Sequence, residues 1–97
     1  MSNYRSSLFI PGHTLNRLER AQNSNADAII VDLEDGCPEA EKLVARETLI
    51  SLLKEKAFTK PLFVRVNDAM EALGRADIDS ISPYQDQIEA IILPKTQ

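Results

Sequence analysis

The stretch AIIVDLED, residues 28–35, decides the fold class. Its first half, from Ala28 to Val31, is a run of apolar and mostly β-branched residues. Such a run is typical of a strand that is buried on both faces, as in a parallel sheet. Because the run stops abruptly at Asp32, the sequence predicts a buried parallel strand that ends in an acidic turn.

Similar segments lie on both sides of this stretch. Three further apolar runs, each followed by polar or turn residues, predict strands over residues 8–10, 62–66 and 90–93. Between the strands, apolar residues recur at helical spacing and predict helices over residues 15–23, 38–56 and 71–80. We expect Thr14 to cap the first helix and Pro38 to be the first residue of the second. The apolar side of the second helix is expected to carry Leu43, Ile50, Leu53 and Ala57.

The alternation of strands and helices predicts an α/β fold with parallel strands and right-handed crossovers. Two architectures fit: an open doubly wound sheet, and half of a (β/α)₈ barrel. A complete barrel needs roughly 200 to 400 residues. Since no linker interrupts the chain, residues 1–97 are expected to form a single partial domain, which matches four of the eight strands of a barrel.

Composition excludes several classes of function. The 97 residues carry a diffuse net charge of −4, which argues against a nucleic-acid partner. No run of 18 apolar residues exists, so we expect no membrane association, and the N-terminus lacks the apolar core of a secretory signal. The single cysteine, Cys37, cannot form an internal disulfide. A cytoplasmic location is therefore expected.

The predicted strands end in unusually polar residues. In both architectures the active site lies at the carboxyl ends of the parallel strands, so these residues are the candidates for chemistry. They are His13 after the first strand, Asp32, Glu34 and Asp35 after the second, Arg65 and Asn67 after the third, and Lys95 after the fourth.

Arg65 needs an explanation, because an arginine inside a strand of Leu, Phe and Val is costly to bury without a partner. Side chains alternate along a strand, so Phe63, Arg65 and Asn67 should share one face. We expect Arg65 to pair with Asp32, with Glu34 or with a carboxylate of a ligand. Two interpretations stay open: a structural ion pair, and a clamp for an anionic substrate, which guanidinium binds through two parallel hydrogen bonds.

The acidic turn, residues 32–35, allows three roles. It could coordinate Mg²⁺, directly or through water, because hard cations prefer carboxylate oxygens. It could orient Arg65 or Lys95. It could also be a polar loop that caps the following helix.

The strand-end motifs resemble those of the citrate lyase β-subunit family, within the HpcH/HpaI aldolase/citrate lyase superfamily. The matching segments are RSSLFIPG (5–12), ADAIIVDLED (26–35), VRVN (64–67) and LPKT (93–96), and Lys42, Ala45-Arg46, Gly74 and Asp77-Ile78 also fit. The resemblance implies the N-terminal half of a TIM barrel, from a Mg²⁺-dependent enzyme that makes or breaks a carbon–carbon bond next to a carbonyl. Its members act on acyl thioesters carried by coenzyme A or an acyl carrier protein, and they assemble as homo-trimers or hexamers.

The resemblance also implies roles for individual residues. Arg65 would bind the oxo-acid substrate, and Glu34 and Asp35 would act beside it by ordering metal-bound water. The wider substrate-binding set is Asp32, Asn67 and Lys95. Arg5 and Arg17 would lie where the thioester carrier approaches. The metal ligands are expected after Gln97, so the 97 residues alone are expected to lack activity.

Two departures put the substrate in doubt: Asp68 and Glu71 stand where the family carries Pro and Thr. Two other functional hypotheses remain. One is a non-catalytic module that self-associates through its open sheet edges. The other is a signalling domain of the receiver type, which the Arg65-Val66-Asn67 strand end disfavours because that domain needs an aspartate there.

Overall fold

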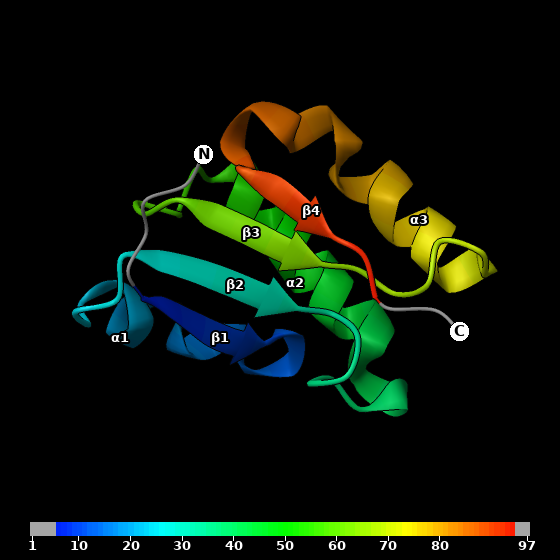
Figure 1. The fold of residues 1–97 in the computed structure, drawn as a ribbon, viewed down its shortest axis with the longest axis horizontal. Helices are drawn as coiled ribbons and strands as arrows, with labels where there is room; N and C mark the ends of the chain where they lie inside the picture. Colours follow the sequence, from blue (N-terminus) through cyan, green and yellow to red (C-terminus); the bar gives the residue numbers. More distant parts are fainter. Residues whose placement is uncertain (1–5, 95–97) are drawn as a thin grey trace.

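The computed structural model, which describes residues 6–94, contains one four-stranded sheet in which every strand is parallel to its neighbours. The strands follow one another across the sheet in the order of the sequence (Figure 1). They are β1 (Ser7–Pro11), β2 (Ala28–Asp32), β3 (Leu62–Arg65) and β4 (Ala90–Ile92). The predicted α/β fold with four parallel strands is confirmed.

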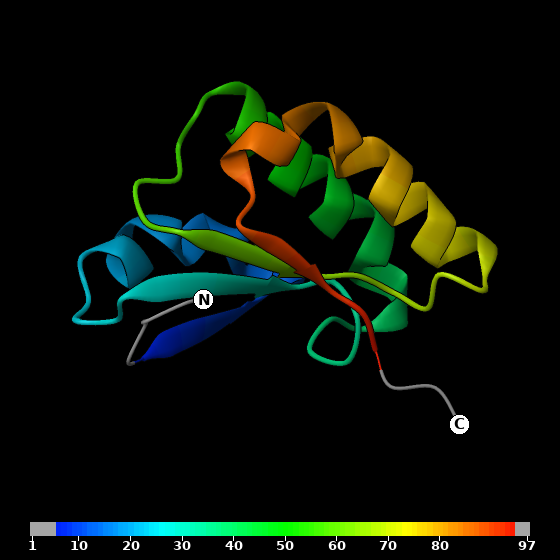
Figure 2. The ribbon, with the colours of Figure 1, turned by 45° about the horizontal axis from the view of Figure 1, so that its top comes forward.

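The helices lie on one face of this sheet (Figure 2). They are the 3₁₀ helix η1 (Gly12–Arg17), α1 (Leu18–Gln22), the 3₁₀ helix η2 (Glu39–Glu41), α2 (Lys42–Lys54), α3 (Ala72–Ile81) and the 3₁₀ helix η3 (Ser82–Gln87). A doubly wound sheet carries helices on both faces, whereas a (β/α) barrel carries them on one. The sequential strand order and the one-sided helices therefore select the barrel type of winding.

The core lies between the sheet and the helices. Val31 and Val64, which are paired in register on β2 and β3, have no exposed surface and pack in one cluster with Leu49 and Leu53 of α2. The opposite face of the sheet carries Phe9, which is 51% exposed. This uncovered face is the side that a barrel would turn toward its axis.

The predicted buried side of α2 is confirmed at Leu53 and wrong at Leu43, while Ile50 and Ala57 pack partly buried against the core. Ala45, Leu49 and Leu53 are buried, whereas Leu43 is 62% exposed. The helix carries more than one apolar stripe, and periodicity alone could not choose between them. The sheet decides, because the stripe spaced four residues apart faces it.

Both predicted helix starts were wrong. Thr14 lies inside η1 with non-helical angles, and its hydroxyl donates to the Pro11 carbonyl at 2.8 Å. Pro38 has an extended ψ of 148° and precedes η2, so α2 begins at Lys42. The residue types at both positions favour the start of an α-helix, but in each case the chain first forms a 3₁₀ helix, η1 before α1 and η2 before α2.

The end of α2 lacks a glycine, yet it follows the pattern in which one residue takes the left-handed conformation. Lys56 has φ 53°, its N–H donates to the Leu53 carbonyl at 3.0 Å, and the Ala57 N–H donates to Leu52 at 3.0 Å. This is the Schellman arrangement. No helix within residues 6–94 has the length and apolar character needed to cross a bilayer.

Candidate active site at the strand ends

The centre of the candidate site is an ion pair between β2 and β3. Asp32 and Arg65 are neighbours in the register of the two strands and point to the same face of the sheet. Arg65 Nε donates to Asp32 Oδ1 at 3.0 Å, and Nη2 donates to Oδ2 at 2.6 Å. The prediction that Arg65 pairs with a carboxylate is confirmed, and the pair has the two-pronged geometry that favours Arg over Lys.

Asp32 is fully engaged by the protein. Besides Arg65, the backbone N–H of Glu34 donates to Oδ1 at 2.9 Å, and that of Gly36 donates to Oδ2 at 2.9 Å. A carboxylate has about four acceptor positions, and these four donors fill them. Only 3% of the surface of Asp32 is exposed, and its predicted role in substrate binding stays a prediction.

The electrostatics of Asp32 follow from these contacts. Burial raises the pKa of its carboxyl, but the hydrogen bonds from Arg65, Glu34 and Gly36 outweigh burial, so the net pKa lies below its ordinary value of 3.8. The hydrogen bonding to Asp32 in turn raises the pKa of the Arg65 guanidinium. The pair is therefore ionised at neutral pH and fixed in place.

Arg65 keeps part of its guanidinium available. Its side chain is 26% exposed, and Nη1 makes no hydrogen bond to residues 6–94. Its Cζ lies over the Phe9 ring, 5.4 Å from the ring centroid. Since Asp32 takes the Nε side, no hydrogen bond from residues 6–94 occupies the edge that joins Nη1 and Nη2, and this edge can face an anion.

The acidic turn places one further carboxylate near Arg65. Glu34 Oε1 lies 3.8 Å from Arg65 Nε, and the side chain is 24% exposed. Burial, followed by the neighbouring Asp35 carboxyl, raises the pKa of Glu34 above its ordinary value of 4.5. Asp35 is exposed at the tip of the turn.

Asn67 does not share the face of Arg65, contrary to the strand alternation. Strand β3 ends at Arg65, and the Asn67 side chain turns to donate to Asp77 Oδ2 of α3 at 2.6 Å and to the Leu33 carbonyl at 2.9 Å. Its Oδ1 accepts from Lys42 Nζ at 2.5 Å. The roles of Lys42 and Asp77 could not be predicted from the sequence pattern, because only the fold brings these residues to this loop.

Three further residues were predicted to bind the substrate or its carrier: Arg5, Arg17 and Lys95. Arg17 is exposed and lines a groove of about 340 Å³ along β1, together with Arg20 and Phe9. Arg5 and Lys95 lie outside the described residues, so their predicted roles stay predictions.

Asp68 organises the loop after Asn67. Asp68 Oδ1 accepts the Met70 N–H at 2.9 Å, and its carbonyl accepts the Glu71 N–H at 3.0 Å. Gly74 in the first turn of α3 packs directly against this loop: a Cβ there would lie 2.0 Å from the Asp68 carbonyl oxygen. Asp68 therefore shapes the turn into α3.

The described residues do not fit a magnesium site by themselves. Within residues 6–94, no group of three or more His, Cys, Asp or Glu side chains is arranged to hold a metal ion. Asp32 has no acceptor position left, which leaves Glu34 and Asp35 as the carboxylates of the turn.

Comparison with known proteins shows the relatives of this chain. It is 40% identical over 93 residues to (3S)-malyl-CoA thioesterase of Cereibacter sphaeroides, covering 95% of this chain and 32% of that protein. It is 30% identical over 98 residues to citrate lyase subunit beta-like protein of Deinococcus radiodurans, covering 96% of this chain and 34% of that protein. The chain thus spans about a third of the length of these relatives.

A solved structure gives the same result. The protein CitE from Mycobacterium tuberculosis, in complex with magnesium, acetoacetate and coenzyme A, superposes with a TM-score of 0.71 at 28% identity. The match covers 97% of this chain and 33% of that one. Residues 5–97 also match the family described as HpcH/HpaI aldolase/citrate lyase. The chain belongs to the HpcH/HpaI aldolase/citrate lyase family.

Proposed function

We propose that the protein containing this chain is a Mg²⁺-dependent carbon–carbon lyase. It would cleave a 3-hydroxyacyl thioester of the citryl, citramalyl or malyl type into an oxo acid and an acyl thioester. The observation that carries the proposal is the Asp32–Arg65 pair at the carboxyl ends of β2 and β3, in which one edge of the guanidinium makes no hydrogen bond to residues 6–94. That edge suits the carboxylate of an oxo acid.

Each residue of the pair has a separate task in this proposal. Arg65 binds the carboxylate next to the reacting carbon. Asp32 holds Arg65 so that the open edge does not rotate away, and the guanidinium carbon lies over the Phe9 ring. Preorganised charge of this kind lowers the barrier because it needs no rearrangement as the reaction proceeds.

The reaction balances without an added oxidant or reductant. The 3-hydroxyl group loses its proton, the C2–C3 bond breaks, and its electron pair passes to the thioester as an enolate. Protonation of the enolate at C2 completes the acyl thioester, while C3 becomes the carbonyl of the oxo acid. Glu34 and Asp35 order water and Arg65 at the mouth of the site, and the raised pKa of Glu34 suits a group that exchanges protons.

A second candidate is thioester hydrolysis. The relative that is 40% identical is named a (3S)-malyl-CoA thioesterase. In that reaction water adds to the thioester carbonyl, the C–S bond breaks, and the products are a free hydroxy acid and a thiol. The same Arg65 edge would hold the distal carboxylate of the substrate in both reactions.

The thioester carrier and the assembly belong to the proposal as well. We propose coenzyme A or an acyl carrier protein as the carrier, approaching over the side of Arg5 and Arg17, and a cytoplasmic homo-oligomer without a nucleic-acid or membrane partner. The magnesium ligands would come from residues other than 6–94.

Product analysis tests the proposal. The complete reading frame that contains these residues is incubated with malyl-CoA, citramalyl-CoA and citryl-CoA, with and without EDTA. An oxo acid and acetyl-CoA in equal amounts, abolished by EDTA, are expected. Release of free coenzyme A and a hydroxy acid would indicate the thioesterase, and no turnover of any substrate would refute both. Size-exclusion chromatography of the 97-residue chain tests the self-association alternative, which a compact monomer would refute.

A further inference from the structure

A buried polar network lies behind the acidic turn and connects it to the loop after β3. We propose that Lys42 is a positioning residue: it fixes Glu34 relative to Arg65 by holding these two loops together. The inference rests on the proposed function for its catalytic consequence, because Glu34 and Arg65 are the groups that it would position.

The Lys42 ammonium group makes three hydrogen bonds, which use all of its protons. Nζ donates to the carbonyls of Leu33 at 3.3 Å and Glu34 at 3.0 Å, and to Asn67 Oδ1 at 2.5 Å. The two carbonyls belong to the turn after β2, and Asn67 follows β3. One side chain from the start of α2 therefore joins the ends of both strands.

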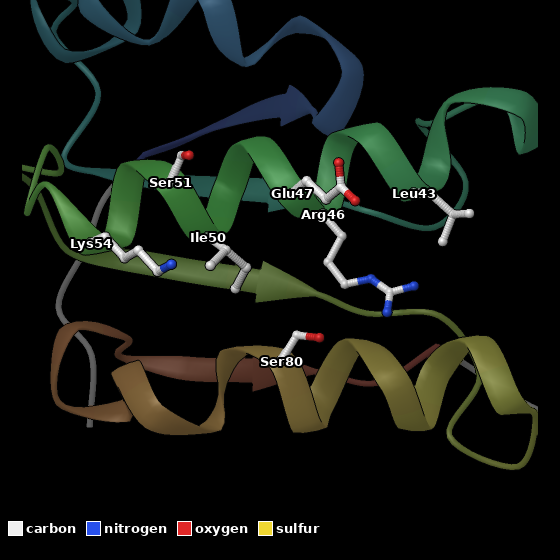
Figure 3. A pocket seen from close by; sticks show the side chains of 7 residues that line it. All are labelled: Leu43, Arg46, Glu47, Ile50, Ser51, Lys54 and Ser80. Atoms are coloured by element: carbon white, nitrogen blue, oxygen red, sulfur yellow. The ribbon is translucent and has the colours of Figure 1, made fainter.

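The network continues from Asn67 into the helices. Asp77 of α3 is 1% exposed, and its Oδ2 accepts from both the backbone N–H and the side-chain amide of Asn67. Its Oδ1 lies 3.3 Å from Arg46 Nε. Figure 3 shows Arg46 reaching from α2 toward α3 across the groove between the two helices. Because Lys42 and Arg46 are four residues apart, they lie on one side of α2 and serve the same network.

The Glu34 peptide is thus held from both ends. Its N–H donates to Asp32 Oδ1, and its carbonyl accepts from Lys42 Nζ. With both groups fixed, the Cα–Cβ bond of Glu34 starts toward Arg65 from a fixed position, and the carboxylate lies 3.8 Å from Arg65 Nε. The Cys37 N–H also donates to the Glu34 carbonyl at 3.1 Å, but that bond lies within the turn, so Lys42 is the contact that joins Glu34 itself to the loop after β3.

The first test uses amide hydrogen exchange of the 97-residue chain by NMR, with K42M as the variant. Met keeps the length of the side chain but donates no hydrogen bond. The amides of Glu34 and Gly36 are expected to lose protection about tenfold or more, while Ile29, which donates to Pro61 inside the sheet, keeps its protection. K54M, an exposed lysine on the same helix, is the control and should change neither.

Three results would overturn the proposal: unchanged protection at Glu34 and Gly36, an equal loss at Ile29, or a K42M chain that does not fold. The last two would mean that Lys42 stabilises the whole domain rather than the turn.

The second test measures kcat and KM of the complete reading frame in a double-mutant cycle. If Lys42 acts through Glu34, K42M lowers kcat about tenfold in the wild-type background and much less in E34Q. Equal effects in the two backgrounds would overturn the proposal. A wild-type protein without any turnover would refute the proposed function instead, and the exchange experiment would still decide what Lys42 holds.

Discussion

Replacing Asp32 by Asn tests the central ion pair most directly. The substitution keeps the shape of the side chain but removes its charge and turns one acceptor into a donor. Each Asp32 oxygen accepts one hydrogen bond from Arg65 and one from a backbone N–H of the turn, so the new NH₂ group faces two donors in either orientation. We therefore expect D32N to weaken both the pair and the turn.

The magnitude follows from the burial of the two partners. The Asp32 side chain is 4% exposed and the Arg65 side chain 26% exposed. Removing one partner of a fully buried pair costs about 3–5 kcal/mol, and the partial exposure of Arg65 reduces this to about 2–4 kcal/mol. Such a loss is a large share of a stability of about 5–15 kcal/mol for a domain.

The pH dependence has a defined sign. Because the folded-state pKa of Asp32 is lowered below 3.8, the unfolded chain binds more protons than the folded one between the two values. The stabilising contribution is fully present above the unfolded pKa of about 3.9 and is lost as the pH falls through the folded pKa. The difference in the free energy of unfolding between wild type and D32N should thus be largest at neutral pH and should become smaller in acid.

Urea unfolding followed by far-ultraviolet circular dichroism measures this free energy at a series of pH values. Asp79→Asn is the matched control, since it removes an exposed carboxylate of α3 and should change stability by less than about 0.5 kcal/mol. A D32N chain that is as stable as D79N at neutral pH, or a gap that stays constant into acid, would refute the reasoning.

Three further substitutions have defined outcomes. Gly74→Ala should lower the thermal midpoint by several degrees, because overpacking costs about 1–3 kcal/mol and the new Cβ would lie 2.0 Å from the Asp68 carbonyl oxygen. Leu49→Ala, at a position with no exposed surface, should cost about 2–5 kcal/mol in urea unfolding, whereas Leu43→Ala on the same helix should cost far less. Arg65→Lys should lower kcat/KM of the complete reading frame about 100-fold, because lysine cannot hold Asp32 and a substrate carboxylate in paired hydrogen bonds.

Specific results would contradict each of these. An unchanged midpoint for G74A would mean that the loop after β3 moves away from α3 at little cost. Equal losses for L49A and L43A would contradict the assignment of the buried side of α2. An R65K enzyme with wild-type kcat/KM would show that a simple positive charge suffices at this position.

The strands were predictable because each is a short apolar run with a polar end, and that pattern depends only on neighbouring residues. The helix limits were less predictable. Thr14 and Pro38 favour helix starts chemically, but the chain makes 3₁₀ turns at both positions. The end of α2 depends on Lys56, which adopts a left-handed conformation. Glycine is the usual sequence signal for that conformation, and this position has none.

Some contacts of the candidate site could likewise be predicted from the sequence, and others could not. The need for a partner of Arg65 followed from the cost of burying its charge, and two acidic neighbours were evident. Asn67 was misplaced because the strand alternation was extended past Arg65, where β3 ends. Lys42 lies 25 residues from Asn67 along the chain, so no local pattern could join them.

The sequence by itself determined the elements, their parallel order and the residue types at the strand ends, because apolar runs and turn residues act locally. Only the tertiary structure decided which of these residues meet. The register of β2 against β3 places Asp32 beside Arg65, and the packing of α2 and α3 on one face of the sheet brings Lys42, Asn67 and Asp77 together. Contacts between distant residues depend on strand register and helix packing, and both are set by how the whole core is filled.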